Sequence, residues 1–185
     1  MFLKNKKMNI TPTKLNGAYI LNLVHFEDER GSFIKTFHTE IFKENKLDID
    51  FKESYFSTSI KNVIRGMHFQ LPPHDHSKLV YPVEGRVLDV LLDLRMASPT
   101  YGQYCTVELS CENKNGIYIP KGLAHGFRVL SDSATLVYMT TTVYNKGSDT
   151  GIRWDSFGFD WQVDNPLVSE RDKGFVEFKD FKSPF

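Results

Sequence analysis

The segment Asn62–Gln70 combines a permanent cation, a glycine, a titratable imidazole and an amide within an otherwise apolar run. Arg65 keeps its charge at physiological pH and suits the geometry of phosphates and carboxylates. His68 can accept or donate a proton near neutral pH. Because a strand that only fills a core does not need such groups, the segment indicates a site where an anionic substrate is held and a proton is moved.

The spacing of these side chains depends on one glycine. His68 and Gln70 share a face of a regular strand, whereas Arg65 has the opposite parity. A β-bulge at Gly66 would turn Arg65 and His68 toward one cavity, and glycine inside a strand often marks a bulge. The alternative is a hydrogen-bonded core histidine with Arg65 at its rim, and spacing alone favours neither.

A second pattern, Pro120–Phe127, places His125 after a Pro-x-Gly turn. In metal-binding double-stranded β-helices, a Pro-x-Gly-x-x-His pattern supplies one imidazole ligand, and a His-x-His pattern followed by a glutamate supplies the others. His74 and His76 form a His-x-His, but no glutamate stands at the expected position after them. A metal site with His74, His76 and His125 is therefore the second hypothesis.

Three further side chains carry weaker signals when taken alone. Tyr138 shares a strand face with Thr140, where a tyrosine is commonly a core ring with a bonded hydroxyl but can also be a proton donor in a barrel lumen. Lys78 and Asp172 indicate no more than solvated surface charges by themselves.

Period-two patterns in the middle of the chain predict the strands that position these side chains. Arg86–Arg95 alternates as a half-buried strand does, and Ala134–Tyr144 alternates in the same way. Many short strands with few helices are typical of a sandwich or barrel. Shorter apolar runs bounded by turn residues predict further strands at Ala18–Val24, Lys78–Val83, Cys105–Leu109 and Gly116–Ile119.

Two short helical segments are expected. One is predicted at Glu40–Asn45, capped by Thr39, with Ile41 and Phe42 facing inward. The other follows Ser169, which forms a capping box with Asp172 in place of the usual glutamate.

Composition excludes several classes of protein. The 185 residues are 41% hydrophobic and 25% charged, which fits one well-buried domain over 1–185. Because 23 lysines and arginines balance 23 acidic residues, no overall field attracts nucleic acid. Cys105 and Cys111 are predicted to be reduced structural thiols. No signal peptide or membrane span is recognisable, so we expect a cytoplasmic protein.

Taken together, these segments resemble the nucleotide-sugar 3,5-epimerase family, best known from dTDP-4-dehydrorhamnose 3,5-epimerase. Each match is weak alone, but ten of them occur in the same order over most of the chain. They are Asp28–Phe33, Asn62–Gln70, Lys78–Val80, Gly85–Val90, Asp93–Arg95, Ser98–Gly102, Ile119–Phe127, Leu136–Tyr138, Gly151–Trp154 and Ser169–Asp172.

The resemblance implies an all-β fold, a double-stranded β-helix of the cupin-type jelly roll with a few short helical turns. It implies a homodimer whose N-terminal segments, about residues 1–35, are exchanged between subunits. The partner molecule is a nucleotide-diphosphate sugar, and the pathway is deoxysugar and surface-polysaccharide biosynthesis. No metal or other cofactor is expected, because a carbonyl already in the substrate stabilises the carbanion.

The resemblance also assigns catalytic roles. His68 corresponds to the base, and Asp172 to the carboxylate that orients it. Tyr138 corresponds to the acid on the opposite face of the sugar, and Lys78 to the cation beside the developing enolate. A base and an acid on different strands agree with a reaction that inverts a carbon centre.

The same resemblance implies a set of substrate-binding positions: Arg65, Arg30, Gln70, His125, Glu53, Tyr55 and Lys35. Arg65 and Arg30 correspond to diphosphate contacts, and Arg30 is expected to reach across the dimer. Glu53 and Tyr55 stand where the family usually has a Gln-x-Asn segment, and Lys35 replaces its usual acidic residue. These departures predict a retained mechanism with a different nucleotide or sugar, or inversion at one centre instead of two.

Three functions are thus considered. The favoured one is a cofactor-independent epimerase that inverts C3, C5 or both in a nucleotide-linked 4-keto-6-deoxy sugar. The second is a metal-dependent cupin, a dioxygenase or isomerase, for which the missing glutamate is unfavourable. The third is a non-catalytic nucleotide-sugar-binding module on the same fold, which leaves the Tyr138 and Asp172 matches unexplained.

Overall fold

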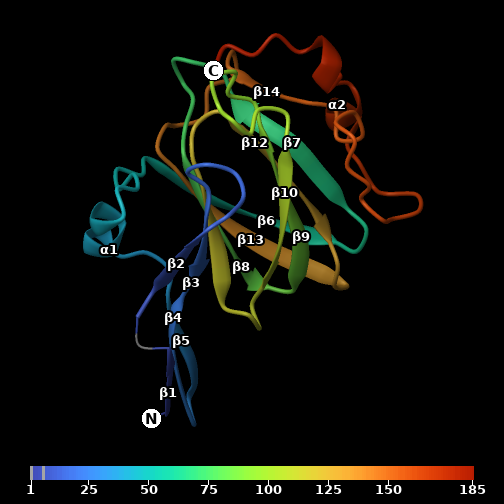
Figure 1. The fold of residues 1–185 in the computed structure, drawn as a ribbon. Helices are drawn as coiled ribbons and strands as arrows, with labels where there is room; N and C mark the ends of the chain where they lie inside the picture. The colour runs from blue at the N-terminus through green and yellow to red at the C-terminus, as the bar shows by residue number, and fades with distance from the viewer. Residues whose placement is uncertain (1, 6) are drawn as a thin grey trace.

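The computed structural model describes residues 2–5 and 7–185, and their strands form three antiparallel sheets (Figure 1). The five-stranded sheet has the order β10 (Tyr104–Ser110), β9 (Arg86–Asp93), β12 (Leu123–Val129), β7 (Ile64–Gln70) and β14 (Asp149–Gly151). The six-stranded sheet has the order β2 (Asn9–Pro12), β3 (Tyr19–Asn22), β11 (Asn115–Ile119), β8 (Lys78–Glu84), β13 (Ser133–Thr140) and β6 (Glu53–Ile60). The three-stranded sheet consists of β1 (Phe2–Asn5), β4 (Val24–Asp28) and β5 (Gly31–Lys35).

The two large sheets pack face to face, and their inner side chains form the main core. Val80 and Leu136 of the six-stranded sheet meet Leu91 and Phe127 of the five-stranded sheet in one buried cluster. Apolar side chains that alternate along each strand bury one face of each sheet in this way. The result is a cupin-like jelly roll, which confirms the predicted fold class.

The predicted strand Ala134–Tyr144 is confirmed in its alternation but ends earlier. Ala134, Leu136, Tyr138 and Thr140 are all buried, whereas the residues between them are only half-buried. The strand stops at Thr140, and residues 141–148 form a loop that faces the candidate site.

The prediction that Arg86–Arg95 is a half-buried strand was wrong in two respects. Strand β9 ends at Asp93, whose carboxylate accepts hydrogen bonds from the backbone and the guanidinium of Arg95 and so turns the chain. Both faces of its second half are buried, since Val90 and Leu92 are covered by a second apolar cluster.

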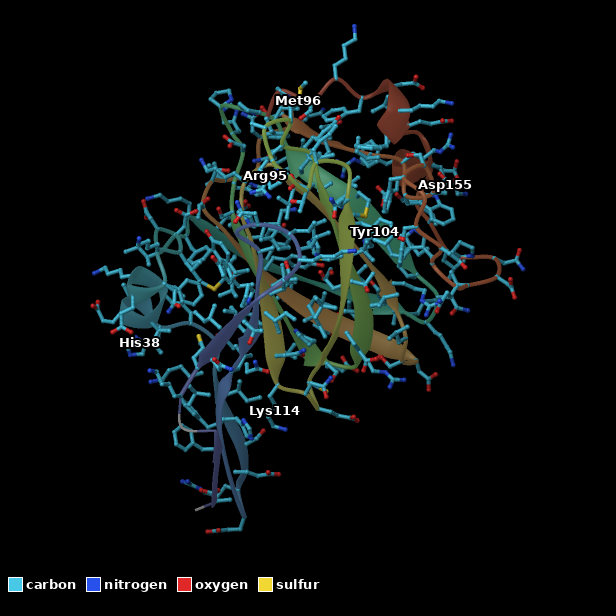
Figure 2. The ribbon with its side chains drawn as sticks, viewed as in Figure 1. His38, Arg95, Met96, Tyr104, Lys114 and Asp155 are labelled. Atoms are coloured by element: carbon cyan, nitrogen blue, oxygen red, sulfur yellow. The ribbon has the colours of Figure 1, made fainter. Side chains whose placement is uncertain are left out.

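That cluster comes from the C-terminal segment, residues 152–185, which lies over the outer face of the five-stranded sheet. Trp161 and Phe181 pack there with Met67 and Val90. The segment finishes beside Met96, whose backbone N–H donates to the carbonyl of Phe185, at the end of the molecule opposite the N-terminal strands (Figure 2).

The N-terminal sheet extends away from the body of the molecule (Figure 1). Beside its base, helix α1 (Thr39–Glu44) packs Phe42 against Leu21 and Tyr118, so the predicted inward orientation of Phe42 is confirmed. The helix begins one residue earlier than predicted: extended His38 occupies the cap position, and no side chain caps it.

The second helical prediction is confirmed at its cap. The Ser169 hydroxyl accepts a hydrogen bond from the Asp172 N–H at the start of α2 (Glu170–Lys173). The Asp172 carboxylate does not complete the capping box, because it bonds to strand β7 instead. The short 3₁₀ helix η1 (Phe178–Asp180) follows, and none of the helices in the described residues has the length and apolarity needed to span a bilayer.

Candidate active site

A cavity of about 370 Å³ opens between the two large sheets, with α2 and the loop before β14 at its side. Most of the side chains that the sequence singled out line it. They are His68, Tyr138, Lys78, Arg65, Gln70, His125, His76, Glu53 and Tyr55. Asp172 lies behind His68 and is bonded to it.

The bulge in β7, one of the two alternatives that the spacing left open, is present. His68 is paired with His125 of β12, and Arg65 is paired with Phe127, so β7 uses one more residue than β12 over this stretch. A Cβ on Gly66 would lie 2.5 Å from the Cα of Gly126, so only glycine permits the two strands to approach this closely. The bulge turns Arg65 and His68 into the same cavity.

His68 and Asp172 form a hydrogen-bonded pair. The imidazole Nε2 donates to Oδ1 of Asp172 at 2.8 Å, and the other carboxylate oxygen accepts the N–H of Gly66 at 3.1 Å. The ring of Phe175 packs edge-on against the imidazole, 5.7 Å away between centroids. In the part of the chain that is described, Nδ1 of His68 has no hydrogen-bond partner, so its lone pair faces the cavity.

The pKa values of His68 and Asp172 are both shifted from their usual values. Burial lowers the pKa of His68, and the hydrogen bond and charge of Asp172 oppose that shift without reversing it. For Asp172, burial raises the pKa, but the hydrogen bond and charge of His68 outweigh it, so the net pKa is lowered. At neutral pH the imidazole is therefore neutral and the carboxylate charged, as a general base requires.

Lys78 supplies a buried positive charge beside this pair. Its ammonium donates to the backbone carbonyl of His68 at 3.2 Å. Burial lowers the pKa of Lys78 to about 8, and the carboxylates of Asp149 and Asp89 partly oppose that shift. The group is still charged at neutral pH and lies within reach of an anion formed in the cavity.

Tyr138 lies on the opposite wall, on β13 of the six-stranded sheet. Its hydroxyl shares a 3.2 Å hydrogen bond with that of Ser57. Burial raises the pKa of Tyr138 above the range of ordinary phenols, which keeps it protonated. A neutral imidazole on one sheet thus faces a protonated phenol on the other.

Two predicted binding residues lie elsewhere. Arg30 is at the β4–β5 turn of the N-terminal sheet, exposed and bonded to Asp28 at 2.6 Å. Lys35 ends β5 and does not line the cavity. Gln70 does line it, but its amide is bonded to backbone atoms of His74 and Asn145 and so ties two loops together.

His76 and His125 both line the cavity, but the three histidines of the metal hypothesis do not form one group of ligands. His125 donates to Asp89 at 2.7 Å, while His74 bonds to Ser148 and His76 to Thr142. Over residues 2–5 and 7–185, no three His, Cys, Asp or Glu side chains are grouped so that they could hold a metal ion. Both cysteines are free thiols, as predicted.

Some cavity residues were not predicted. Asp149 and Arg171 line the cavity and form an ion pair at 2.6 Å. Asp89, buried behind His125, was also missed as a functional group. Arg171 could have been noticed as the neighbour of Asp172, whereas Asp149 starts a strand of three residues that has no visible period.

Comparison with known proteins identifies the family. A family model described as dTDP-4-dehydrorhamnose 3,5-epimerase matches residues 12–180. The chain belongs to the dTDP-4-dehydrorhamnose 3,5-epimerase family. It is therefore an enzyme of the isomerase class.

Individual members of the epimerase family are similar over nearly their whole length. A dTDP-4-dehydrorhamnose 3,5-epimerase from Shigella flexneri is 42% identical over 94% of this chain and 97% of its own. The crystal structure of a dTDP-4-dehydrorhamnose 3,5-epimerase from Elizabethkingia anophelis has a TM-score of 0.88 at 39% identity, with 94% and 97% of the two chains covered. The dTDP-6-deoxy-D-glucose-3,5-epimerase from Legionella pneumophila, in complex with dTDP-4-keto-L-rhamnose, has a TM-score of 0.90 at 35% identity, with 95% of each chain covered.

Proposed function

We propose that the protein is a cofactor-independent epimerase of a dTDP-linked 4-keto-6-deoxy sugar, with His68 as base and Tyr138 as acid. The observation that carries this proposal is the His68–Asp172 pair, which faces a protonated Tyr138 across one cavity. The names of the similar enzymes support the substrate class, and the Legionella enzyme was solved with such a sugar bound.

The first step removes a proton from a carbon next to the C4 ketone. Nδ1 of His68 takes the proton, and the electron pair of the broken C–H bond moves onto the C4 oxygen to form an enolate. Asp172, which accepts the Nε2 hydrogen, stabilises the imidazolium that results. The ammonium of Lys78 stabilises the negative oxygen.

The second step returns a proton from the other face. The Tyr138 hydroxyl protonates the same carbon, the enolate collapses to the ketone, and the centre is inverted. The phenolate then regains a proton from solvent, and His68 releases its own. Repetition at the second carbon inverts C5 as well as C3, and the proposal covers inversion at either centre or both.

Substrate binding is proposed from charge and position. Arg65 lies at the cavity with its guanidinium held by the hydroxyl of Ser59 at 2.8 Å, in a position suited to a diphosphate. Arg30 and Lys35 do not line the cavity of their own chain. Each subunit is a single domain, residues 1–185, and two subunits form a homodimer. They exchange residues 1–35, which brings Arg30 and Lys35 of one subunit to the substrate in the partner's cavity.

Complementation tests this assembly. Arg30→Ala and His68→Asn subunits, each inactive in its own dimer, should regain about a quarter to a half of the activity when mixed and refolded together. Light scattering should give the mass of a dimer. A monomeric mass with full activity, or mixed dimers without any recovery, would exclude exchange of the N-terminal segment.

Hydrogen exchange in heavy water tests the reaction. We expect the enzyme to incorporate deuterium at C3, C5 or both of a dTDP-4-keto-6-deoxy sugar, read by mass and proton spectra, with CDP- and GDP-linked sugars as comparisons. His68→Asn should abolish exchange, whereas His74→Asn, which alters a loop histidine bonded to Ser148, should not. Normal exchange in His68→Asn would remove this residue as the base.

The same assay separates the other two functions. Activity that disappears on chelation and returns with a stoichiometric metal ion would indicate the metal-dependent enzyme. Tight binding of the nucleotide sugar without exchange would indicate a binding module.

A further inference from the structure

A second phenol lies in the cavity, and the proposed reaction does not use it. Tyr55 on β6 is paired in register with Tyr138 on β13. The two rings are nearly parallel, at 14°, with their centroids 4.8 Å apart. Offset parallel rings at this separation attract each other beyond the apolar area that they bury.

The Tyr138 ring is held from several directions. Tyr55 covers one face, the imidazole of His125 approaches edge-on at 6.2 Å, and the Ser57 hydroxyl bonds to the phenol oxygen. Only 7% of Tyr138 is exposed, compared with 44% of Tyr55. The Tyr55 ring therefore lies between Tyr138 and the solvent side of the cavity.

Tyr55 contributes a ring and not an ionised oxygen. Burial raises the pKa of Tyr55 to about 12, and the carboxylates of Glu53 and Asp149 act in the same direction. Its hydroxyl has no hydrogen-bond partner among the residues described. The phenol is neutral at pH 7 and is not anchored by its oxygen, so what it offers Tyr138 is the stacked surface.

We propose that Tyr55 is a positioning residue that holds the Tyr138 phenol in line with the reacting carbon, and so determines whether the enolate is protonated with inversion. This inference rests on the proposed function. An enolate in this cavity can regain a proton from His68 on the face it came from, or from Tyr138 on the other face. The first outcome exchanges hydrogen without inversion once the proton on His68 has exchanged with solvent, and the second inverts the centre.

The ratio of the two outcomes depends on how well the Tyr138 O–H is aligned. A transfer from a misaligned phenol slows, while the transfer from His68 is unchanged because Asp172 and Gly66 hold that side independently. Loss of the Tyr55 ring should therefore raise exchange without inversion, an effect that general destabilisation of the fold would not produce.

Deuterium partitioning tests the proposal with two variants. Tyr55→Leu removes the ring, and Tyr55→Phe keeps it without the hydroxyl. In heavy water, we expect Tyr55→Leu to raise the ratio of deuterium in recovered substrate to deuterium in epimer by about 3- to 10-fold, the range that one aromatic stack can supply. Tyr55→Phe should keep the ratio of the unaltered enzyme, whatever its effect on substrate binding. Phe56→Leu is the control, because this neighbouring ring is 71% exposed and does not line the cavity.

A second measurement does not depend on turnover. Carbon-13 relaxation of the labelled Tyr138 ring, assigned through its loss in Tyr138→Phe, should report a rigid side chain in the unaltered protein and in Tyr55→Phe, and a mobile one in Tyr55→Leu. An unchanged ratio together with a rigid Tyr138 in Tyr55→Leu would overturn the proposal, as would an equal change in Tyr55→Phe. If the unaltered enzyme exchanges no hydrogen with any sugar tested, the proposed reaction fails, and the relaxation data alone decide whether Tyr55 positions Tyr138.

Discussion

Replacing Asp172 by asparagine removes one charge and keeps the shape of the side chain. The buried N–H of Gly66 donates to Oδ2 of Asp172, and Nε2 of His68 donates to Oδ1. An amide has only one acceptor oxygen for these two donors. If that oxygen satisfies Gly66, the amide NH₂ points at His68, which must then accept at Nε2 and carry its proton on Nδ1. The nitrogen that faces the cavity can no longer act as a base.

The size of the loss follows from these two contacts. Turning the amide to restore the active tautomer leaves the Gly66 N–H without an acceptor, which costs about 1–3 kcal/mol for a buried donor. Loss of the charged hydrogen bond to the imidazolium costs about 1.5–3 kcal/mol more. The sum of about 2.5–6 kcal/mol corresponds to a fall in kcat of roughly 10² to 10⁴-fold.

The assay is the pH dependence of deuterium exchange and of epimer formation. In the unaltered enzyme, kcat/KM should rise with pH as His68 loses its proton, through a pKa below the usual value for histidine, and then stay level up to about pH 8, where Lys78 begins to lose its charge. In Asp172→Asn, burial of His68 is no longer opposed by a carboxylate, so the rising limb should move to lower pH while the plateau falls. Glu170→Gln is the matched control, since it removes a charge from the same helix at a side chain that pairs with Lys173 and not with His68.

Two results would refute this reasoning. One is a loss in kcat of less than tenfold in a folded Asp172→Asn protein, which would mean that the carboxylate does not determine the tautomer of His68. The other is a rising limb displaced to higher pH, which would mean that the Asp172 carboxylate does not raise the pKa of His68.

Three other changes have defined outcomes. Lys78→Met should lower kcat by ~10²-fold at pH 7, because the charge beside the enolate is lost. The fall in kcat/KM that the unaltered enzyme shows above about pH 8, where Lys78 loses its charge, should be absent in the variant. If the fall persists in Lys78→Met, another group causes it. Arg65→Gln should raise KM by about 10- to 150-fold with little change in kcat, and should weaken the dependence of KM on ionic strength; a fall in kcat with unchanged KM would contradict a role in diphosphate binding. Gly66→Ala should lower the free energy of unfolding in urea by more than ~2 kcal/mol, because the new Cβ would lie 2.5 Å from the backbone of Gly126. Gly147→Ala, whose Cβ would meet only one side-chain atom at 3.4 Å, should change it little.

Features that depend on neighbouring residues could be predicted from the sequence. The alternation along residues 134–144 predicted that Leu136 and Tyr138 share a face of β13, because side chains on a strand alternate whatever lies around them; that this face is the buried one is shown by the structure. The cap at Ser169 was predicted, and the bulge at Gly66 was recognised as one of two alternatives, for the same kind of reason, since each follows from backbone geometry over a few residues. The residues to which the proposal gives catalytic roles were found through motifs that occur in the same order as in the family. One cavity brings together His68, Lys78 and Tyr138, and also Arg65 and Gln70 from the motif of His68.

Features that depend on distant parts of the chain were decided by the tertiary structure. Val90 of β9 is buried on the outer face of its sheet only because the C-terminal segment lies over it. The Asp149–Arg171 ion pair and the buried Asp89 behind His125 had no local signal that marked them as neighbours. Lys78 and His68 have lowered pKa values because the fold takes them out of water. A local pattern sets where a side chain points, but burial and charge are summed over everything that packs around it, and that sum exists only after the chain has folded.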